Sequence, residues 1–319
     1  MKNLKQIAAI VVVFVAVQLL AIAFMHYALG EEDQVFSDPG DPMIAVFYIA
    51  MVLGFTLFFL VLVKLGLEKV LKGIFFVSIG FIVFFVATFL AALFVPDVGE
   101  ASVWIVFAIG IAIAALSVIA IWRYPEWYVI DLVGLPMAVG VIALLGISFG
   151  IIPMLLLLIG LAIYDFISVY KTKHMLTLAE GVSEMGLPLL LVVPKKLPYS
   201  YREQKLKLRD KPGEKKEREA FLVGLGDMII PGLLASSAFW FISASDAFAQ
   251  SPVSPFDVPG YMLVALGTIA GAAIGLTALM RIVVKGNPQA GLPLLNGGAI
   301  AGFFITYLLV FGFNFSYMA

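Results

Sequence analysis

The stretch FLVGLGDMIIP, residues 221–231, places Asp227 among apolar residues that would otherwise be typical of a membrane-spanning helix. A carboxylate in the hydrocarbon of a bilayer costs about 2.5 kcal/mol or more, so an aspartate there needs a functional reason. Gly224 and Gly226 precede it and leave space beside the carboxylate for backbone, water or a substrate strand. Asp227 is therefore the first candidate functional residue, and the rest of the chain has to supply its partner.

The composition of the chain indicates a membrane protein. Of its 319 residues, 62% are hydrophobic and only 13% are charged, which sets aside a soluble protein. Cysteine is absent, so disulfides, a thiol nucleophile and cysteine-based metal sites are excluded. The two imidazoles belong to His26, expected at the end of a helix, and to His174, in a basic loop. We expect no metal, no cofactor and no nucleic-acid partner.

Nine apolar segments are long enough to cross a bilayer, which takes about 20 residues. Gly146, Gly150 and Pro153 favour a turn between the fifth and sixth of them, although one long helix is the rival interpretation. The first is expected to be an uncleaved helix, because the apolar part of a signal peptide has only about 7–15 residues. The sequence therefore predicts an all-α polytopic membrane protein. The segments cover approximately Gln6–Leu29, Met43–Val63, Leu71–Val95, Ser102–Trp122, Trp127–Ile147, Ile151–Tyr170, Glu219–Ile242, Tyr261–Val284 and Gly291–Phe313.

Charge placement predicts the topology and the division of the chain. Residues 1–170 hold the first six helices, residues 171–218 form a basic loop, and residues 219–319 hold the last three helices. If the N-terminus is cytoplasmic, all 20 basic residues fall on the cytoplasmic side, as the positive-inside rule requires. We therefore expect a multi-pass protein of the cell membrane with a cytoplasmic 171–218 loop and an outer C-terminus.

Three aspartates lie within the apolar segments. Asp165 precedes Lys171 by six residues, about 9 Å along a helix, and Asp227 follows Arg218 by nine residues, about 13 Å. On antiparallel neighbouring spans, these two carboxylates are predicted at similar depth near the cytoplasmic side, where they could face each other. Asp131 lies near the inner interface and is interpreted as a snorkelling or locally hydrogen-bonded acid.

A facing pair of carboxylates has a recognisable chemistry. Two close carboxylates do not both ionise cheaply, so they share one proton; one then takes a proton from water while the other gives one to a peptide carbonyl. This is the arrangement of aspartic proteases. Two other classes stay open on the residues alone: a secondary transporter or ion pathway that uses the two aspartates as a proton relay, and a non-catalytic membrane scaffold.

Three motifs resemble those of the presenilin and signal peptide peptidase family of GxGD intramembrane aspartyl proteases. Tyr164-Asp165 is similar to the YD motif of the sixth span, and residues 224–227, GLGD, are similar to GxGD on the seventh. Residues 291–295, GLPLL, stand where a PAL motif opens the ninth span, with Leu294 in the place of alanine. The resemblance covers essentially the whole chain and is greatest to archaeal presenilin homologues.

The resemblance implies an aspartic endopeptidase that cleaves transmembrane helices of protein substrates within the lipid bilayer. It implies that Asp165 and Asp227 are the acid/base pair that activates water. It also implies that the GLPLL segment shapes the floor of the site. The substrate-contacting residues predicted in this way are Tyr164, Gly224, Gly226, Pro293, Leu294 and Leu295.

Two further expectations concern how substrates bind. The apolar run Leu189–Val193, LLLVV, either pairs with an extended substrate as an added strand or rests as a loop at the interface. A cytoplasmic N-terminus matches presenilins and is opposite to signal peptide peptidases, so we expect substrate helices whose N-termini lie outside. A homo-oligomer is left open.

Overall fold

Nine helices of the chain are long and apolar enough to cross a membrane, counted within the residues that the structure describes. The computed structural model describes residues 4–96, 98–172, 190–196, 198–201, 219–245, 250–253, 257–284 and 289–318. The predicted number of spans is therefore confirmed, whereas most of the predicted 171–218 loop lies outside the described residues. The nine helices are α1 (Leu4–Ala28), α2 (Met43–Lys64), α3 (Glu68–Ala92), α4 (Glu100–Arg123), α5 (Trp127–Ser148), α6 (Ile151–Ile167), α9 (Leu225–Ser243), α11 (Gly260–Val283) and α12 (Leu292–Phe311).

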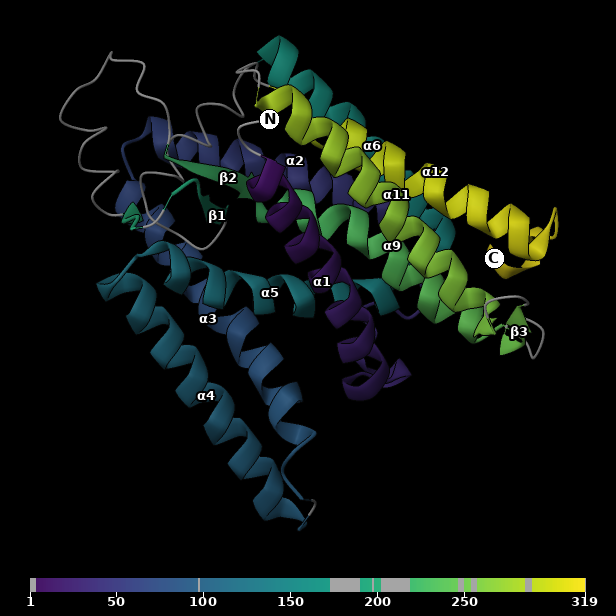
Figure 1. Ribbon diagram of the computed structural model, residues 1–319. Coiled ribbons are helices and arrows are strands. Elements are labelled where there is room, and N and C mark those ends of the chain that lie inside the picture. Colours follow the sequence, from purple (N-terminus) through teal and green to yellow (C-terminus); the bar gives the residue numbers. More distant parts are fainter. Residues whose placement is uncertain are drawn as a thin grey trace.

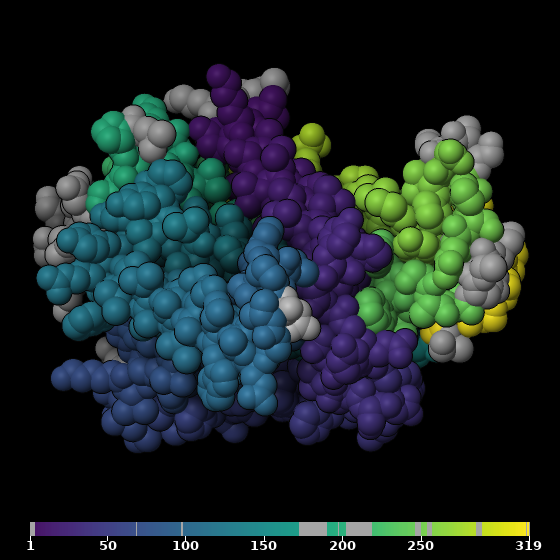
Figure 2. Space-filling view, turned by 90° about the horizontal axis from the view of Figure 1, so that it is seen from below, coloured from purple at the N-terminus to yellow at the C-terminus, as the bar shows by residue number. Residues whose placement is uncertain are grey.

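The helices form a bundle from which one hairpin projects. Figure 1 shows α11 and α12 side by side, with α6 and α9 packed against them, while the α3–α4 hairpin points away from this group. Helix α1 crosses between the two parts, and Figure 2 shows it in purple between teal and green helices. The interior is apolar, and the fully buried side chains of Phe14, Leu158, Leu234 and Phe303 contribute to one core. The same core includes Leu161, Met228 and Leu295, which lie close in sequence to the candidate residues of α6, α9 and α12.

The break between α5 and α6 is sharp, so the rival interpretation of one long helix is wrong. Helix α5 ends at Ser148 and α6 begins at Ile151. The N–H of Gly150 donates a hydrogen bond to the carbonyl oxygen of Pro39 at 2.8 Å. A methyl group at position 150 would lie 2.8 Å from the same oxygen, so the turn needs glycine at this close approach. This turn ends α5 and starts α6, and Asp165 lies at the far end of α6.

Small residues bring α11 and α12 into close contact. A side chain at Gly271 would meet the carbonyl oxygen of Gly298 and lie 2.9 Å from the Cα of Gly302. Backbones that approach this closely gain dispersion energy without relying on a hydrophobic effect, which is weak between helices in lipid. The contact fixes α12, whose first residues enter the candidate site.

The seventh span begins later than the sequence predicts. Instead of a helix from Glu219, residues Ala220–Gly224 form strand β2, which pairs antiparallel with β1 (Leu190–Pro194), and α9 starts only at Leu225. Gly224 has extended backbone angles and caps the helix. The prediction was wrong here because four apolar residues of the strand run directly into the apolar helix. As a consequence, Asp227 lies in the first turn of α9 rather than inside it.

The two small sheets lie at opposite ends of the bundle. Figure 1 shows β1 and β2 at the end where α1 begins, and β3 (Pro252–Val253) at the other end near the C-terminus. Strand β3 pairs with β4 (Val258–Pro259). Three short helical turns, η1 (Glu31–Asp33), η2 (Ser168–Thr172) and η3 (Phe315–Met318), complete the described elements.

Candidate active site

Asp165 lies near the end of α6, where the helix widens into the π-helical turn η2. Its side chain is only 6% exposed. Oδ2 of Asp165 accepts a hydrogen bond from the backbone N–H of Leu292 at 3.0 Å. Leu292 is the first residue of α12, and N–H groups in the first turn of a helix have no partner within the helix. The positive end of the α12 dipole therefore faces the carboxylate of Asp165.

Asp227 lies in the first turn of α9 and is partly exposed. Glycines surround its carboxylate. A methyl group at Gly291 would lie 3.1 Å from Oδ2 of Asp227 and 3.3 Å from its Cγ, and one at Gly224 would lie 3.6 Å from Oδ2. Because both residues are glycines, no Cβ fills the space beside this carboxylate, as the sequence suggested for Gly224.

The two carboxylates meet the same dipeptide, Gly291–Leu292, at the start of α12. Leu292 donates its N–H to Asp165, and Gly291 lies against Asp227. Both carboxylates thus lie beside two consecutive residues of the chain. Pro293 follows at the second helical position, where its fixed φ and missing N–H suit a helix start. Two carboxylates placed in this way can share a proton, and the pair can act as acid and base toward a water molecule.

Two buried amide side chains hold the helices that carry the aspartates. Asn296 on α12 donates its Nδ2 hydrogen to the carbonyl oxygen of Leu158 on α6 at 2.8 Å. Gln18 on α1 donates from Nε2 to the carbonyl oxygen of Met228, the residue after Asp227, at 2.8 Å. Both amides lie in apolar surroundings, where a hydrogen bond to backbone fixes the relative position of two helices.

The predicted substrate-contacting residues occupy different surroundings. Gly226 is exposed beside Asp227, and a methyl group there would meet no atom within 4 Å. Pro293 and Leu294 are partly exposed on the first turn of α12. Leu295 is fully buried in the core. Contact of these residues with substrate stays a prediction.

Tyr164, the other predicted substrate contact, reaches toward α2. Its hydroxyl donates to Oγ1 of Thr56 at 3.2 Å, so the side chain links α6 to α2. Gly224 ends strand β2 and lies next to the Asp227 carboxylate. Their roles toward substrate also stay predictions.

Gly291 and Leu292 are the site residues that the sequence reasoning missed. Within the GLPLL segment, the sequence predicts substrate contacts for the last three residues only. A signal was present, because proline directly after Leu292 marks a helix start and hence unpaired N–H groups. Almost every residue type carries a backbone N–H, so the residue types in the motif do not reveal which N–H acts as a donor.

Asp131 is hydrogen-bonded, as one of its two interpretations requires, but its partner lies on another element and 61 positions along the chain. Its Oδ1 accepts a hydrogen bond from the backbone N–H of Val192 in β1 at 2.9 Å. Its carboxylate binds the backbone of β1, whereas those of Asp165 and Asp227 lie at Gly291–Leu292. Within the described residues, no group of three or more His, Asp or Glu side chains is arranged to hold a metal ion.

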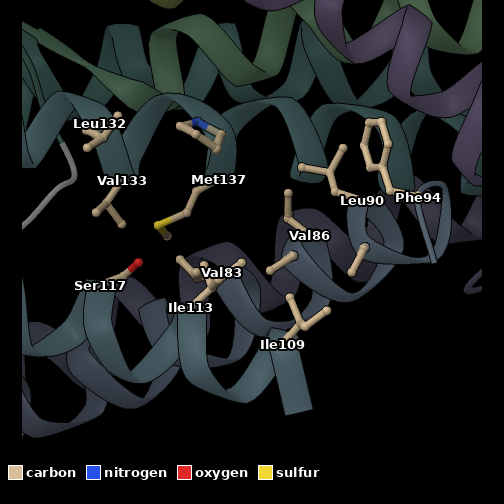
Figure 3. Close-up of a pocket in the computed structure, with 13 residues that line it drawn as sticks. Val83, Val86, Leu90, Phe94, Ile109, Ile113, Ser117, Leu132, Val133 and Met137 are labelled. Atoms are coloured by element: carbon tan, nitrogen blue, oxygen red, sulfur yellow. The ribbon is translucent and has the colours of Figure 1, made fainter. Parts of the chain in front are cut away.

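A cavity of about 380 Å³ lies between α3, α4 and α5, away from the aspartates. Figure 3 shows its lining, where Val86, Leu90, Ile113 and Met137 present hydrocarbon and thioether groups, and Ser117 brings a hydroxyl. No carboxylate or imidazole takes part in this lining. The cavity therefore offers no acid/base chemistry of its own.

Comparison with known proteins shows which family shares this architecture. A family model described as signal-peptide peptidase, presenilin aspartyl protease matches residues 11–312. A solved structure of a presenilin family intramembrane aspartate protease, in space group C222, is 29% identical; the match covers 95% of this chain and 99% of that chain, with a TM-score of 0.64. A second structure so described, in space group P2, is 30% identical over 94% of this chain and 97% of that chain, with a TM-score of 0.61. No curated protein matches the chain.

The family match extends over nearly all of the described helices, from α1 to α12. Both solved structures share the helical arrangement over almost their full length. The chain is therefore a multi-pass integral membrane protein and an enzyme of the intramembrane aspartyl protease class. It belongs to the signal-peptide peptidase and presenilin family of aspartyl proteases.

Proposed function

We propose that this protease hydrolyses peptide bonds within transmembrane helices of membrane-protein substrates, with Asp165 and Asp227 as the dyad that activates water. The observation that carries the proposal is the convergence of both carboxylates on Gly291–Leu292. Family membership favours hydrolysis over the alternative of a transporter with a proton relay.

The surroundings of the two carboxylates suggest different roles. The N–H of Leu292 and the start of α12 stabilise negative charge on Asp165, so we assign Asp165 as the base that takes a proton from water. Asp227 then carries the shared proton and gives it to the oxygen of the scissile carbonyl as water attacks the carbon. The tetrahedral intermediate collapses when the proton held by Asp165 passes to the leaving nitrogen. Asp227 then recovers the proton of the hydroxyl, which restores the starting state.

A substrate helix has to unwind before this chemistry, because a helical peptide bond is shielded and hydrogen-bonded. The N–H of Lys195 donates to the carbonyl of Glu219 at 2.8 Å, which continues the β1–β2 ladder. By the alternation of an antiparallel ladder, the N–H and C=O groups of Ala220 and Leu222 point away from β1. We place the extended substrate on this outer edge of β2, next to Asp227. The LLLVV run would then support the substrate strand through β2 instead of pairing with it directly.

The proposed topology has the N-terminus and the β1–β2 sheet on the cytoplasmic side and the C-terminus outside. The start of α1 and the C-terminus lie at opposite ends of the bundle, which supports an odd number of crossings (Figure 1). The distribution of all 20 basic residues supports a cytoplasmic N-terminus and an outer C-terminus.

The experiment that tests the function uses purified protein in liposomes with a single-span substrate. Mass spectrometry of the products gives the position of the cut. We expect cleavage inside the apolar span, toward its cytoplasmic end. No cleavage, or cleavage confined to the residues outside the span, would contradict the proposal.

A further inference from the structure

The start of α5 holds the sheet that leads into the candidate active site. The outward N–H of Val192 in β1 donates to Oδ1 of Asp131 at 2.9 Å. Further along the same segment, Glu126 accepts hydrogen bonds from the hydroxyl of Ser200 at 2.8 Å and from the N–H of Tyr201 at 3.0 Å. Asp131 of α5 and Glu126, the residue that caps its start, therefore hold the chain at two points, one in β1 and one at residues 200–201.

The register of the sheet shows why the bond to Asp131 is specific. The Lys195–Glu219 hydrogen bond belongs to the pairs that link β1 and β2, so Val192, three positions away, lies in the alternate set. Its N–H points away from β2 and would be unpaired without Asp131. The carboxylate thus occupies the outer edge of β1 at Val192, and β2 occupies the inner edge.

Apolar packing strengthens the same attachment. Ile130, next to Asp131, is 1% exposed and packs in one cluster with Val192, Tyr201 and Ala220. Val192 and Ala220 belong to opposite strands, so one face of the sheet rests on α5. Tyr199 also packs against this cluster. Burial raises the pKa of its hydroxyl to about 12, and the neighbouring Tyr201, Glu219 and Glu126 add to the effect.

The chain connects the sheet held by α5 directly to the candidate site. Val192 pairs with Leu222, and Gly224 ends β2 and caps α9. Asp227 follows in the first turn of that helix. A shift of β1 relative to α5 would therefore move the backbone that sets the position of the Asp227 carboxylate, and with it the outer edge of β2.

We propose that Asp131 is a positioning residue of the protease: by holding the Val192 amide, it fixes the β1–β2 sheet and thereby aligns Asp227 with the scissile bond. This inference rests on the proposed function, because the reaction that Asp131 would align is the hydrolysis proposed there. It predicts a larger effect on turnover and on the position of the cut than on substrate affinity.

The test compares Asp131→Leu, which removes the acceptor, with Asp131→Asn, which keeps an acceptor oxygen. For Asp131→Leu we expect kcat to fall about tenfold or more, KM to change less than about threefold, and secondary cleavage positions to gain intensity. For Asp131→Asn we expect kcat within about threefold of the unmodified protein and the original cleavage position. Equal damage in both variants, or unchanged kcat and cleavage positions in Asp131→Leu, would overturn the proposal.

A second pair of variants tests the donor, the N–H of Val192, without changing the membrane span. Val192→Pro deletes the outward N–H only, whereas Val193→Pro deletes an N–H that faces β2 and serves as the matched control for sheet disruption. Asp131→Leu combined with Val192→Pro should turn over no more slowly than the slower single variant, because one interaction is lost in all three. If the fold-loss of kcat in the double variant equals the product of the losses in the two single variants, the proposal is overturned.

Hydrogen exchange separates this inference from the proposed function, since it needs no cleavage. Asp131→Leu should exchange amides of residues 190–193 and 219–227 about tenfold faster than the unmodified protein, with the exchange of α11 unchanged. Unchanged exchange in residues 219–227 would overturn the inference even if the unmodified protein cleaves its substrate. Accelerated exchange in a protein that cleaves no substrate would support the role of Asp131 in holding the β1–β2 sheet and would refute the proposed function.

Discussion

The backbone N–H of Leu292 donates a hydrogen bond to the carboxylate of Asp165 across 3.0 Å, which joins the start of α12 to the end of α6. The neighbouring Gly291 lies against the carboxylate of Asp227. The third motif thus takes part in the site through its backbone, and an added side chain at its glycine would disturb Asp227.

Gly291→Ala should impair catalysis without unfolding the protein. The added methyl group would lie 3.1 Å from Oδ2 of Asp227, so the carboxylate has to shift by a few tenths of an ångström. A shift of this kind in a catalytic group is expected to lower kcat by about tenfold or more. Gly297→Ala in the same helix is the control, because a methyl group there meets nothing within 4 Å. Equal activity of the two variants in the liposome assay would count against the site.

The two leucines of the Pro-Leu-Leu motif should separate stability from specificity. Leu295 is 0% exposed, so Leu295→Ala should lower the free energy of unfolding by about 2–5 kcal/mol. Leu294 is partly exposed, and Leu294→Ala restores the alanine of the family pattern, so it should change the cleavage position with a smaller loss of stability. Thermal unfolding in detergent and product mass spectrometry measure the two effects. A larger loss of stability in Leu294→Ala would contradict this placement.

Gln18 should tolerate an apolar replacement better than a charged one. Gln18→Met removes the hydrogen bond to the Met228 carbonyl, at a cost of about 1 kcal/mol, and also removes Oε1, a buried oxygen without a partner among the described residues. Gln18→Glu places a carboxylate against the same carbonyl and should cost at least about 2.5 kcal/mol. Midpoints of thermal unfolding compare the two, and a reversed order would show that the Met228 contact is misassigned.

Substrate orientation follows from the topology. If the β1–β2 sheet is cytoplasmic, a substrate whose N-terminus lies outside presents its unwound cytoplasmic end to the edge of β2. One substrate helix reconstituted in both orientations should be cleaved mainly in the orientation with its N-terminus outside. Cleavage at equal rates in both orientations would contradict this expectation.

The sequence predicted the membrane spans and the aspartate pair because hydropathy and charge placement act over whole segments. Helices α5 and α6 separate at the glycine turn that the sequence indicated, and Asp165 and Asp227 lie on neighbouring spans near the same dipeptide. Carboxylates are conspicuous in apolar sequence, since their cost requires a compensating role.

The sheet and the backbone contacts were harder to predict for physical reasons. Strand β2 exists because Ala220–Gly224 pairs with residues about thirty positions earlier, and no local pattern distinguishes these apolar residues from the start of a helix. The donor at Leu292 is a backbone group, so its role depends on where α12 begins and not on side-chain type. The partner of Asp131 was unpredictable for the same reason, since it is the amide of Val192.

The measurement that tests the central claim most directly is cleavage of a transmembrane-helix substrate in liposomes by Asp165→Asn and by Asp227→Asn, each with its fold verified by thermal unfolding. The control is Asp38→Asn, an exposed aspartate of the loop before α2 whose Oδ1 accepts a hydrogen bond from the N–H of Gly40. We predict that each dyad variant loses at least about 100-fold in rate while the control keeps the rate of the unmodified protein. Cleavage retained by either dyad variant would remove that aspartate from the mechanism and contradict the account.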